Sequence, residues 1–513
     1  MTGYLIGVDA GNTMVKAALF DRTGTTLAVA SRSSETLQPA PGFVERAPEG
    51  LWQAASGAIR DCLQKAGVSG AEVLAVGAAG HGNGLYLLDE EGRGLIGIQS
   101  MDNRAEALAT QIAAANGDEI MTRAQSRPWP AMTPVLLRWM AENKPDLMAR
   151  AHRALLCKDV IVFGLTGRMG SDVSDLAGAG LLALPALQYD DALLRLYGIE
   201  ALRPILPEPA QSDEVVGHVT AEAATATGLA EGTPVVGGLF DVLASTLGAG
   251  TSRAGEASIV AGSWSINQIF ATALPEEPRA LLASVLGRDT WVSCECSPTS
   301  AANLEWFVQT FLSAEAKALG EDPFDLCNRL AAESDPARDL PVFHPFLYAG
   351  PVPGARGGFN AVGAWHSRAD MVRALYEGVA FGHRAHFEIL DPERRFRTAT
   401  LSGGAAKSRF WAQIFADALG MTLHLSDCVE TGARGAAIAA AIGAGLFDSF
   451  DEATRTMARH VTHVAPDPAA QAQLDTRYRR WCAYRDALGA AWAAPQVDAC
   501  EPHKTQAERT SHG

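Results

Sequence analysis

Residues 4–20 read YLIGVDAGNTMVKAALF, two short apolar runs on either side of a polar corner. The runs Tyr4–Asp9 and Val15–Phe20 have the length and composition of β-strands, and the Gly-Asn-Thr sequence between them favours a turn. Another run of this kind, Thr25–Ala30, follows a second turn. The stretch therefore predicts a meander of three strands with a polar loop at its first corner.

The rest of the chain alternates short apolar runs with longer helical patterns. Residues 49–66 carry apolar side chains at helical spacing from Leu51 to Leu63, and residues 73–78 form another short apolar run. Alternation of this kind is typical of an α/β protein.

A second group of predicted strands follows in the C-terminal half, at residues 256–261, 268–271 and 290–294. It echoes the N-terminal meander, and this repeat indicates two domains. We place them at residues 1–247 and 248–490. Residues 491–513 are polar without periodicity and are predicted to be a loose tail.

Composition and charge limit the classes of partner. The chain has 513 residues, of which 48% are hydrophobic and 19% charged, so it is globular rather than disordered. Its 42 Lys and Arg against 58 Asp and Glu leave a formal net charge of −16, which argues against broad binding to nucleic acid or anionic membranes. The N-terminus lacks a basic stretch followed by an apolar one, and the long uncharged run Ala257–Pro275 contains amides and hydroxyls. We therefore expect no nucleic-acid partner, no membrane span and a cytoplasmic location.

Two further classes of site are excluded by missing motifs. The eight cysteines include no CxxC pair, so neither a zinc knuckle nor a thioredoxin motif is present, and reduced thiols are expected. There is no GxxxxGK[ST] motif, which excludes a P-loop kinase.

The corner after the first predicted strand is a candidate phosphate loop. Asp9 ends the strand, and Gly11, Asn12, Thr13 and Lys16 follow it. Backbone N–H groups of such a loop can surround a phosphate, the carboxylate can hold a hydrated Mg²⁺ ion, and a nearby cation can neutralise phosphate charge. The alternative is an ordinary hairpin turn, because Asn and Gly favour turns in any context.

A second carboxylate stands at the end of a predicted buried strand. The run from Thr233 to Asp241 is largely apolar, and an Ala- and Leu-rich helical pattern follows it. Catalytic groups of α/β proteins lie at the carboxyl ends of such strands, and Asp is also a good helix N-cap. Asp241 is therefore a candidate for both roles.

Two more glycine-containing turns follow predicted strands in the C-terminal half. One contains Gly262 and Ser263, and the other is the sequence Gly403-Gly404-Ala405. A pair of glycines lets the backbone approach a ligand closely, although tight turns alone would explain both. The small residues at 430–437 open a predicted helix and indicate close helix packing.

Polar side chains after two other apolar runs form a candidate polyol pocket. The first group is the loop of His81, Gly82 and Asn83, and the second contains Asp102 and Arg104. Polyols are bound by Asp, Asn, His and Arg groups of this kind. The alternatives are a loop histidine with partners inside the protein and a surface arginine at a helix start.

In their order and spacing, these motifs resemble the FGGY family of carbohydrate kinases over residues 4–490. The sequence TPVLLRWMAEN at 133–143 fits the first family signature, except that Leu136 stands where Lys is usual. The sequence GFNAVGAWHSRADMVRALYE at 358–377 fits the second signature. The resemblance implies an α/β fold of two actin-like (ribonuclease-H-like) domains flanking a catalytic cleft.

The resemblance also assigns roles to single residues. Asp241 would be the general base that takes the proton from a sugar hydroxyl, and Asp9 would orient the Mg²⁺ ion. ATP would contact residues of both domains: Asn12, Thr13, Lys16, Gly262, Ser263, Gly403, Gly404, Ala405 and Ser408. A small-molecule sugar would contact His81, Gly82, Asn83, Asp102, Arg104 and Asp241. The implied cofactors are therefore ATP and Mg²⁺.

This sequence departs from the family pattern at several positions. Asn12 and Ser263 stand where Thr is common, and both can still donate hydrogen bonds. Lys16 stands where some members have Arg, and a cation remains there. The Gln-Met-His-Gly pattern of xylulokinases is absent at residues 81–84, and the arginine–glutamate pair of glycerol kinases is absent around residue 102. D-Xylulose and glycerol are therefore disfavoured as substrates.

Within the family, the likeness is greatest to L-xylulose and 3-keto-L-gulonate kinases. It rests on Gly237–Val242, Ser297–Ser300 and Asn303–Phe307. The hydroxyls and N–H groups of Ser297–Ser300 could face a sugar or a carboxylate, or could simply start a helix. Kinases of erythritol and of other polyols or pentuloses stay alternatives.

Two other classes of function are compatible with this fold. A non-catalytic sugar or nucleotide sensor would not need a catalytic base such as Asp241. An actin-like or Hsp70-like ATPase would not need the polyol pocket or the signature at 358–377. The sequence therefore predicts an ATP-dependent phosphotransferase that acts on an alcohol group of a ketose or sugar acid. We expect it to form a homo-oligomer, a dimer.

Overall fold

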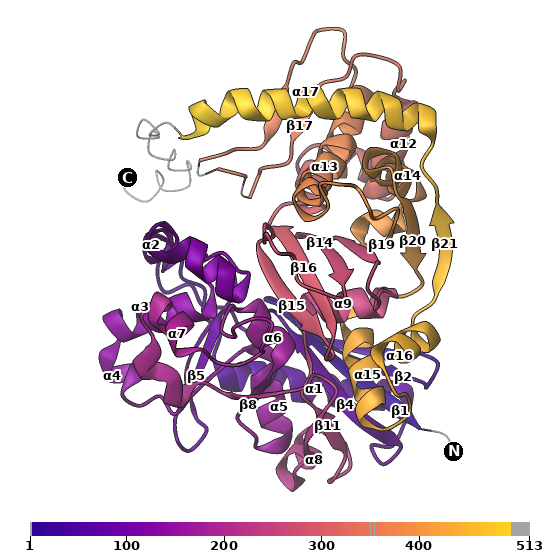
Figure 1. Cartoon of the computed structure of the whole chain (residues 1–513). Coiled ribbons are helices and arrows are strands. Elements are labelled where there is room, and N and C mark those ends of the chain that lie inside the picture. The colour runs from indigo at the N-terminus through magenta and orange to yellow at the C-terminus, as the bar shows by residue number, and fades with distance from the viewer. Residues whose placement is uncertain (1–2, 349, 353, 494–513) are drawn as a thin grey trace, which may run out of the picture.

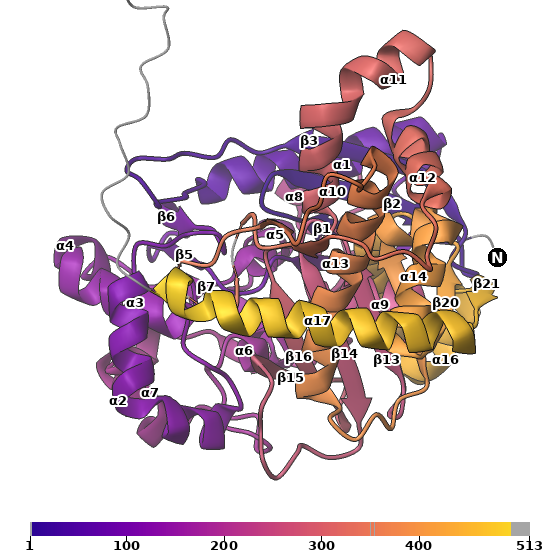
Figure 2. The same cartoon turned by 90° about the horizontal axis from the view of Figure 1, so that it is seen from above.

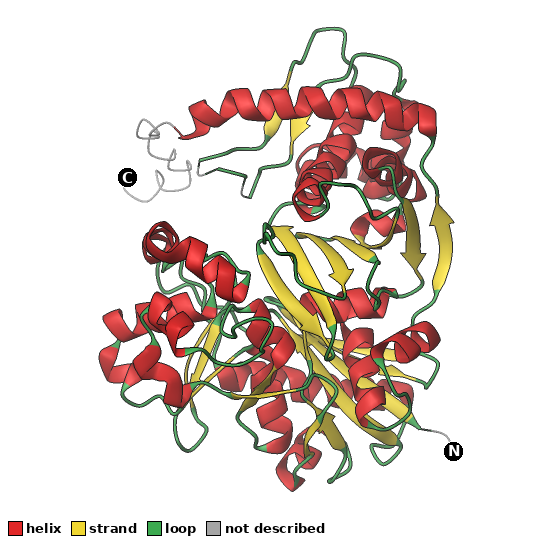
Figure 3. Ribbon diagram, viewed as in Figure 1, coloured by secondary structure: helices red, strands yellow, loops and turns green. Residues whose placement is uncertain are grey.

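The computed structural model describes residues 3–348, 350–352 and 354–493, and it contains two large sheets surrounded by helices (Figure 1, Figure 3). The first sheet comprises β1 (Tyr4–Ala10), β2 (Met14–Phe20), β3 (Thr26–Ser33), β4 (Val73–Gly80), β10 (Val215–His218), β11 (Pro234–Val236) and β12 (Leu239–Phe240). Its order is β10-β11-β4-β1-β2-β3, with β12 paired to β4. Because β1, β2 and β3 are sequentially antiparallel, the predicted N-terminal meander is confirmed.

The second sheet belongs to the C-terminal half. It comprises β13 (Ala257–Ala261), β14 (Ser265–Ala271), β15 (Leu282–Leu286), β16 (Thr290–Ser297), β19 (Thr398–Gly403), β20 (Thr422–Ser426) and β21 (His460–Val464). Its order is β15-β16-β14-β13-β19-β20-β21. The predicted strands β13, β14 and β16 form an antiparallel meander, and β15 extends its edge without having been predicted. Each sheet adds parallel strands to its meander, so the predicted α/β class is confirmed.

Helices and smaller sheets complete both halves. The helices of the N-terminal half are α1 (Pro48–Ala66), α2 (Glu106–Ala124), α3 (Thr133–Asn143), α4 (Pro145–Met148), α5 (Cys157–Thr166), α6 (Val173–Gly178), α7 (Asp191–Tyr197), the 3₁₀ helix η1 (Glu200–Ile205), α8 (Ala221–Thr227) and α9 (Asp241–Ala249). Those of the C-terminal half are α10 (Ala302–Phe307), the π-helix η2 (Val308–Leu312), α11 (Ser313–Leu319), α12 (Pro323–Glu333), α13 (Arg368–Leu390), the 3₁₀ helix η3 (Gly404–Lys407), α14 (Arg409–Leu419), α15 (Thr431–Gly443), α16 (Phe450–Met457) and α17 (Pro468–Ala493). The smaller sheets contain β5 (Leu85–Leu88), β6 (Gly94–Ile98) and β7 (Arg153–Leu155), then β8 (Gly170–Asp172) with β9 (Glu208–Ala210), and β17 (Val342–His344) with β18 (Gly358–Asn360). Figure 2 shows α17 running across the outer side of the C-terminal half.

The predicted helix at 49–66 is confirmed as α1. Pro48 lies in its first turn, where the missing N–H costs no hydrogen bond, and Gly67 ends it with a left-handed φ of 66°. Leu51 and Ile59 are fully buried, as the helical spacing indicates.

The first signature segment is largely buried, whereas the second is exposed or half-buried over residues 358–369 and mostly buried from Asp370 onward. Residues 133–143 coincide with α3, and Leu136 is fully buried in the core of the N-terminal half. An apolar side chain at this position therefore agrees with its surroundings. Residues 358–377 span β18 and the first part of α13.

α9 and α15 share a core with strands of both sheets and approach their neighbours very closely. A β-carbon on Gly7 in β1 would lie 1.7 Å from the carbonyl oxygen of Ala433, and one on Gly435 would lie 1.9 Å from that of Ala244. Only glycine fits there, because any side chain would overlap backbone atoms. The predicted close packing at 430–437 is thus confirmed. α15 follows β20 in the chain but packs on β1 and β4, so a helix of the C-terminal half completes the core of the first sheet (Figure 1).

The single strand predicted for residues 233–241 is wrong. β11 ends at Val236, Gly238 adopts a left-handed φ of 84°, and β12 begins at Leu239. A β-carbon on Gly238 would lie 2.3 Å from the carbonyl oxygen of Ala78 in β4, so the break depends on glycine. Asp241 begins α9 directly after β12, which places it at a strand end and a helix start together.

The thiols agree with the expectation over the described residues, whereas the start of the predicted tail departs from it. Seven cysteines in this part of the chain are free: Cys62, Cys157, Cys294, Cys296, Cys327, Cys428 and Cys482. α17 extends to Ala493, so residues 491–493 of the predicted tail are helical, and residues 494–513 lie outside the described residues. Among the described helices, none is long and apolar enough to cross a membrane.

Candidate active site

The carboxyl ends of β1, β4 and β12 meet at one edge of the first sheet. β1 and β12 both run parallel to β4, and Ala10 and Phe240 are each paired with Gly80. Ligand sites of α/β proteins lie beyond such strand ends. The edge brings together three predicted site residues: Asp9, His81 and Asp241.

The negative charge of Asp9 acts on the carboxyl group of Asp241. Burial and then the negative charge of Asp9 raise the pKa of Asp241 from 3.8 to about 8, while the N–H groups of Val242 and Gly82 lower it in part. Burial also raises the pKa of Asp9 to about 6, and the charge of Lys16 opposes this shift. Taken as whole residues, Asp9 and Asp241 are half-buried. A carboxylate with a raised pKa is a stronger base, and a bound divalent cation would favour the charged forms.

The start of α15 borders the Asp9 carboxylate. A β-carbon on Gly432 would lie 2.2 Å from Oδ2 of Asp9. The carboxylate of Glu430, just before the helix, forms an ion pair with Nζ of Lys16 at 2.8 Å. The negative charge of Glu430 also raises the pKa of Asp9. The acidic site is therefore built by residues from both halves of the sequence.

The loop after β1 offers backbone groups more readily than side chains. Gly11 is open, because an added β-carbon would be 3.5 Å from the nearest atom, and Thr13 is exposed. The amide of Asn12 instead exchanges hydrogen bonds of 3.1 and 3.2 Å with the hydroxyl of Ser100. Phosphate contacts of Asn12, Thr13 and Lys16 stay a prediction.

The second sheet has a matching edge at the ends of β13 and β19. The two strands run parallel with Ala261 paired to Gly403, so the two glycine-containing turns lie side by side. Around Gly262 an added β-carbon would meet no atom closer than 4.0 Å, and Ser263 and Gly404 are exposed. This edge has room for a ligand against its backbone.

Two of the residues predicted to contact ATP, Ala405 and Ser408, are engaged within the protein. Ala405 is fully buried. Ser408 caps α14, because its Oγ accepts from the N–H of Trp411 at 3.2 Å and donates to Oδ1 of Asn328 at 2.8 Å. Their nucleotide contacts stay a prediction.

The loop before α10 packs on the turn after β13. The N–H of Ser300 donates to the carbonyl of Ser263 at 3.2 Å, and that of Ala301 donates to Gly262 at 2.8 Å. The hydroxyl of Ser300 lies 2.8 Å from Nε2 of the buried His383. The loop therefore supports the turn, and this hydroxyl is engaged inside the protein rather than facing a ligand.

Buried side chains contact His81 in the loop after β4. His81 is only 3% exposed, and its Nε2 lies 3.2 Å from both Nη2 of Arg46 and the hydroxyl of Tyr86. Its Nδ1 is buried and has no hydrogen-bond partner. Burial and the charge of Arg46 lower the pKa of His81 to about 3, so the ring is neutral at physiological pH.

Glycine next to His81 makes room for an aromatic ring. A β-carbon on Gly82 would lie 2.0 Å from the ring of Phe240, and one on Gly178 in α6 would lie 2.8 Å from the same ring. The ring of Phe240 therefore lies between Gly82 and Gly178. Phe240 is the residue directly before Asp241 in the sequence. Asn83 adopts a left-handed φ of 60°, so this loop is sharply turned.

Asp102 and Arg104 bind each other and a neighbouring loop. Nη2 of Arg104 lies 2.9 Å from Oδ2 of Asp102 and 2.7 Å from Oε1 of Glu45, and its guanidinium lies 4.3 Å from the ring centre of Phe43. Asp102 also accepts from the N–H of Val44 at 2.6 Å. Both charged side chains are almost fully buried, so their direct contact with a sugar stays a prediction.

Arg46 and Tyr86 are two site residues that sequence reasoning missed. Arg46 stands in an irregular loop and Tyr86 in the apolar strand β5, and neither belongs to a recognisable motif. Their role depends on contacts with His81, which no local pattern reveals.

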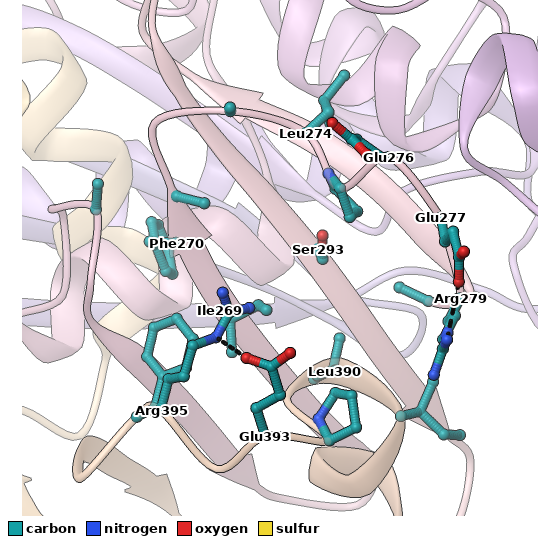
Figure 4. Close-up of a pocket in the computed structure, with 18 of the residues that line it drawn as sticks. Ile269, Phe270, Leu274, Glu276, Glu277, Arg279, Ser293, Leu390, Glu393 and Arg395 are labelled. Atoms are coloured by element: carbon teal, nitrogen blue, oxygen red, sulfur yellow. Dashed lines mark hydrogen bonds and ion pairs between the residues drawn. The ribbon is translucent and has the colours of Figure 1, made fainter.

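A cavity of about 880 Å³ lies elsewhere, and none of the predicted site residues lines it (Figure 4). It is bounded by the far end of β14, the following loop and the chain after α13. Four of its charged residues pair with one another, Arg279 with Glu277 and Arg395 with Glu393. The cavity is therefore separate from the predicted site residues at the ends of the two sheets.

The residues at the first edge fit a magnesium ion and the phosphates of a nucleotide. Mg²⁺ is usually held by one or two carboxylates together with water and phosphate oxygens, and Asp9 supplies such a carboxylate. No cluster of three or more His, Cys, Asp or Glu side chains suited to a metal was found among the described residues. The backbone at Gly11 and Gly262 is not covered by neighbouring atoms, so its N–H groups could approach the phosphates of a nucleotide.

Comparison with protein families gives two matches. Residues 4–248 match the N-terminal domain of the FGGY family of carbohydrate kinases, and residues 257–444 match its C-terminal domain.

Relatives and solved structures agree with these matches. The chain is 33% identical to the L-xylulose/3-keto-L-gulonate kinase of Escherichia coli (strain K12), over 94% of this chain and 96% of that protein. It is also 33% identical to a probable L-xylulose kinase of Pasteurella multocida, over 95% and 99% of the two chains. The crystal structure of xylulose kinase from Rhodospirillum rubrum has a TM-score of 0.84 at 28% identity, covering 95% of this chain and 99% of that one. The gluconate kinase of Lactobacillus acidophilus shares the fold, with a TM-score of 0.87 at 23% identity, covering 96% and 99%.

The fold, the two strand-end carboxylates and these likenesses define an ATP-dependent phosphotransferase that acts on a sugar. The chain belongs to the FGGY family of carbohydrate kinases. The predicted actin-like fold is confirmed as well.

Proposed function

We propose that this kinase phosphorylates a hydroxyl of L-xylulose or 3-keto-L-gulonate, with Mg²⁺ as its metal. The relatives with these names are 33% identical over almost the whole chain, which supports this choice among sugars. The observation that supports catalysis most directly is the raised pKa of Asp241, about 8, at the edge it shares with Asp9.

Asp241 is the base in this proposal. Its carboxylate accepts the proton of the attacking hydroxyl, and the raised pKa gives this transfer a larger driving force. The N–H groups of Gly82 and Val242 hold the carboxylate in place. We expect kcat/KM to fall on the acidic side as Asp241 becomes protonated.

Asp9 would hold the metal, which would neutralise charge on the transferred phosphoryl group. Backbone at Gly11 and at Gly262 would bind the phosphates from the two sheets. Gly403 and Gly404 lie beside Gly262 and would carry the nucleoside side. In-line transfer depends mainly on such positioning.

His81, Gly82 and Asn83 line the sugar site in this proposal. Nδ1 of His81 is a buried ring nitrogen without a partner inside the protein, so it is suited to a substrate oxygen. Asp102 and Arg104 would contact the sugar beside this loop. The domain boundaries at 247 and 490, the homodimer and the cytoplasmic location stay predictions.

The test is a coupled assay of ADP release over a panel of sugars. The panel contains L-xylulose, 3-keto-L-gulonate, L-ribulose, D-xylulose, erythritol and glycerol. We expect the highest kcat/KM for one of the first two. A higher value for erythritol or D-xylulose would overturn the substrate assignment.

The control for catalysis is Asp241→Asn. We expect this variant to bind ATP and sugar while turnover falls about 10²–10⁴-fold, the usual contribution of a positioned base. Turnover within a few-fold of the parent protein would remove Asp241 from the base role. Sugar binding without any turnover in the parent protein would favour the sensor.

A further inference from the structure

Arg46 is a buried cation without a carboxylate partner. Its side chain is 0% exposed, and no Asp or Glu of the described residues forms an ion pair with it. Its guanidinium donates instead to the carbonyl of Gly11 at 2.9 Å, to the hydroxyl of Tyr86 at 2.7 Å and to Sγ of Cys157 at 3.1 Å. A buried charge is costly to maintain, so this network of neutral acceptors calls for an explanation.

Arg46 also contacts His81. Nη2 of Arg46 lies 3.2 Å from Nε2 of His81. Nη2 has two hydrogens for Tyr86, Cys157 and His81, and a guanidinium only donates, so a hydrogen bond from Arg46 to His81 requires Nε2 as the acceptor. The hydroxyl of Tyr86 already accepts from Arg46 and lies 3.2 Å from the same Nε2, to which its own proton can be donated.

These contacts leave one place for the ring proton of His81. A neutral imidazole carries a single proton, and with Nε2 accepting it must be on Nδ1. Nδ1 is buried and no group of the protein meets hydrogen-bond geometry with it, although backbone groups of Gly82 and Asn83 lie near enough to oppose the lowering of the pKa of the ring. The N–H of Gly82, the next residue, contacts Asp241, so Nδ1 of His81 belongs to a loop that touches the proposed base.

Arg46 also connects this loop with the phosphate loop. The guanidinium that fixes His81 holds the carbonyl of Gly11 as well. The N–H of His81 in turn donates to the carbonyl of Ala10 at 3.0 Å. One buried side chain, that of Arg46, therefore fixes the positions of the loop after β1 and the loop after β4 relative to each other.

We propose that Arg46 is a positioning residue that holds His81 in the Nδ1–H form, so that Nδ1 donates a hydrogen bond to an oxygen of the sugar. The proposal rests on the sugar kinase function for the last step. The state of the ring does not depend on substrate and is tested without it.

The direct test is nitrogen NMR of protein labelled with ¹⁵N-histidine, with His81 assigned by the signal lost in His81→Asn. Without ligands, we expect Nδ1 to be protonated and Nε2 unprotonated, unchanged between about pH 5 and pH 9. An Nε2–H or doubly protonated ring in this range would overturn the proposal. Because the parent protein is measured, this test does not depend on the folding of a variant at Arg46.

A double-mutant cycle tests the consequence for catalysis. We expect Arg46→Met to lower kcat/KM for the sugar about 10- to 100-fold, since small misplacements at a reacting site have effects of this size. In the His81→Asn background the same change should have a clearly smaller effect, because an Asn amide donates without a tautomer to fix. Equal losses in both backgrounds would show that Arg46 does not act through His81, and Arg46→Lys is the second variant if Arg46→Met fails to fold.

The matched control removes another buried arginine. Arg384 is 7% exposed and donates to the carbonyl of Ala418 at 3.0 Å and to Asp475 at 2.6 Å, within the C-terminal half. Arg384→Met should leave the His81 signal unchanged and show no coupling to His81→Asn. If the protein shows the expected ring state of His81 but is inactive on every sugar, the proposed function is refuted. The action of Arg46 on His81 would still stand in that case.

Discussion

A β-carbon on Gly432 would lie 2.2 Å from Oδ2 of Asp9, so the first turn of α15 leaves no space beside this carboxylate. The two residues are far apart in sequence and come from opposite halves of the chain. In the proposed mechanism Asp9 holds Mg²⁺, so the contact connects the position of α15 with the metal site.

We predict that Gly432→Ala lowers kcat and raises the Mg²⁺ concentration needed for half-maximal activity. The new methyl group must displace either the carboxylate or the start of the helix, and a displacement of about 1 Å can cost roughly 10²-fold in rate. Initial rates over a Mg²⁺ titration, with excess chelator as the zero point, measure both effects.

Gly117→Ala in α2 is the control, because an added β-carbon there would have no atom within 4 Å. We expect it to behave as the parent protein. Unchanged Mg²⁺ dependence in Gly432→Ala, or full activity in excess chelator, would contradict the role of Asp9.

We predict that Asp241→Asn stabilises the ligand-free protein at alkaline pH. The pKa of Asp241 is raised from 3.8 to about 8 in the folded state, so the folded protein holds an additional proton between these values. The free energy of unfolding therefore falls as the pH rises through this window, and a neutral Asn avoids the loss. We expect a difference of about 1–3 kcal/mol above pH 8 and almost none near pH 4.

Chemical denaturation of both proteins in chelator at the two pH values measures this difference. Asp118→Asn, on an exposed part of α2, should show no such pH dependence. Equal stabilities of the parent protein and Asp241→Asn above pH 8 would mean that the carboxylate is not destabilised by its surroundings.

We predict that Lys16→Met raises the KM for ATP about 10-fold while changing the KM for the sugar little. Nζ of Lys16 is 2.8 Å from Glu430 beside Asp9, and a charged hydrogen bond to phosphate is worth roughly 1.5–3 kcal/mol. Steady-state kinetics with each substrate varied separate the two KM values. Lys65→Met removes an exposed lysine of α1 and should change neither, and an unaltered KM for ATP in Lys16→Met would place Lys16 outside the nucleotide site.

We predict that sugar together with a non-hydrolysable ATP analogue makes the protein more compact. The phosphate loop at Gly11 and the turn at Gly262 belong to different sheets, and in-line transfer needs both around one phosphate chain. We expect the hinge near Gly248–Thr251, because glycines allow large changes of φ and ψ. Gly248 itself is packed tightly, since a β-carbon there would lie 1.8 Å from the carbonyl of Thr431, whereas Gly250 has a left-handed φ of 109° after the end of α9.

Small-angle scattering of free and doubly liganded protein measures this change as a smaller radius of gyration. Binding of both ligands is established separately by calorimetry. An unchanged radius at saturation would mean that the free protein is already closed and would leave the hinge without support.

The sequence alone determined those features that nearby residues encode. The alternating apolar runs and the Gly-Asn-Thr corner predict β1, β2 and their turn, because strand and turn preferences act over a few residues. Asp9 and Asp241 were found in the same way, as polar residues that end apolar runs. The family followed from motifs whose order is itself a property of the chain.

Tertiary structure alone decided which distant residues meet. No pattern around Gly432 shows that it presses on Asp9, and none around Arg46 shows that it holds His81, because these contacts depend on how α15 and the loop before α1 pack on the first sheet. The break at Gly238 has the same origin, since the carbonyl of Ala78 in β4 determines what fits there. Local preferences are properties of single segments, whereas close packing and the electrostatics of buried charges are set by neighbours that only the folded chain brings together.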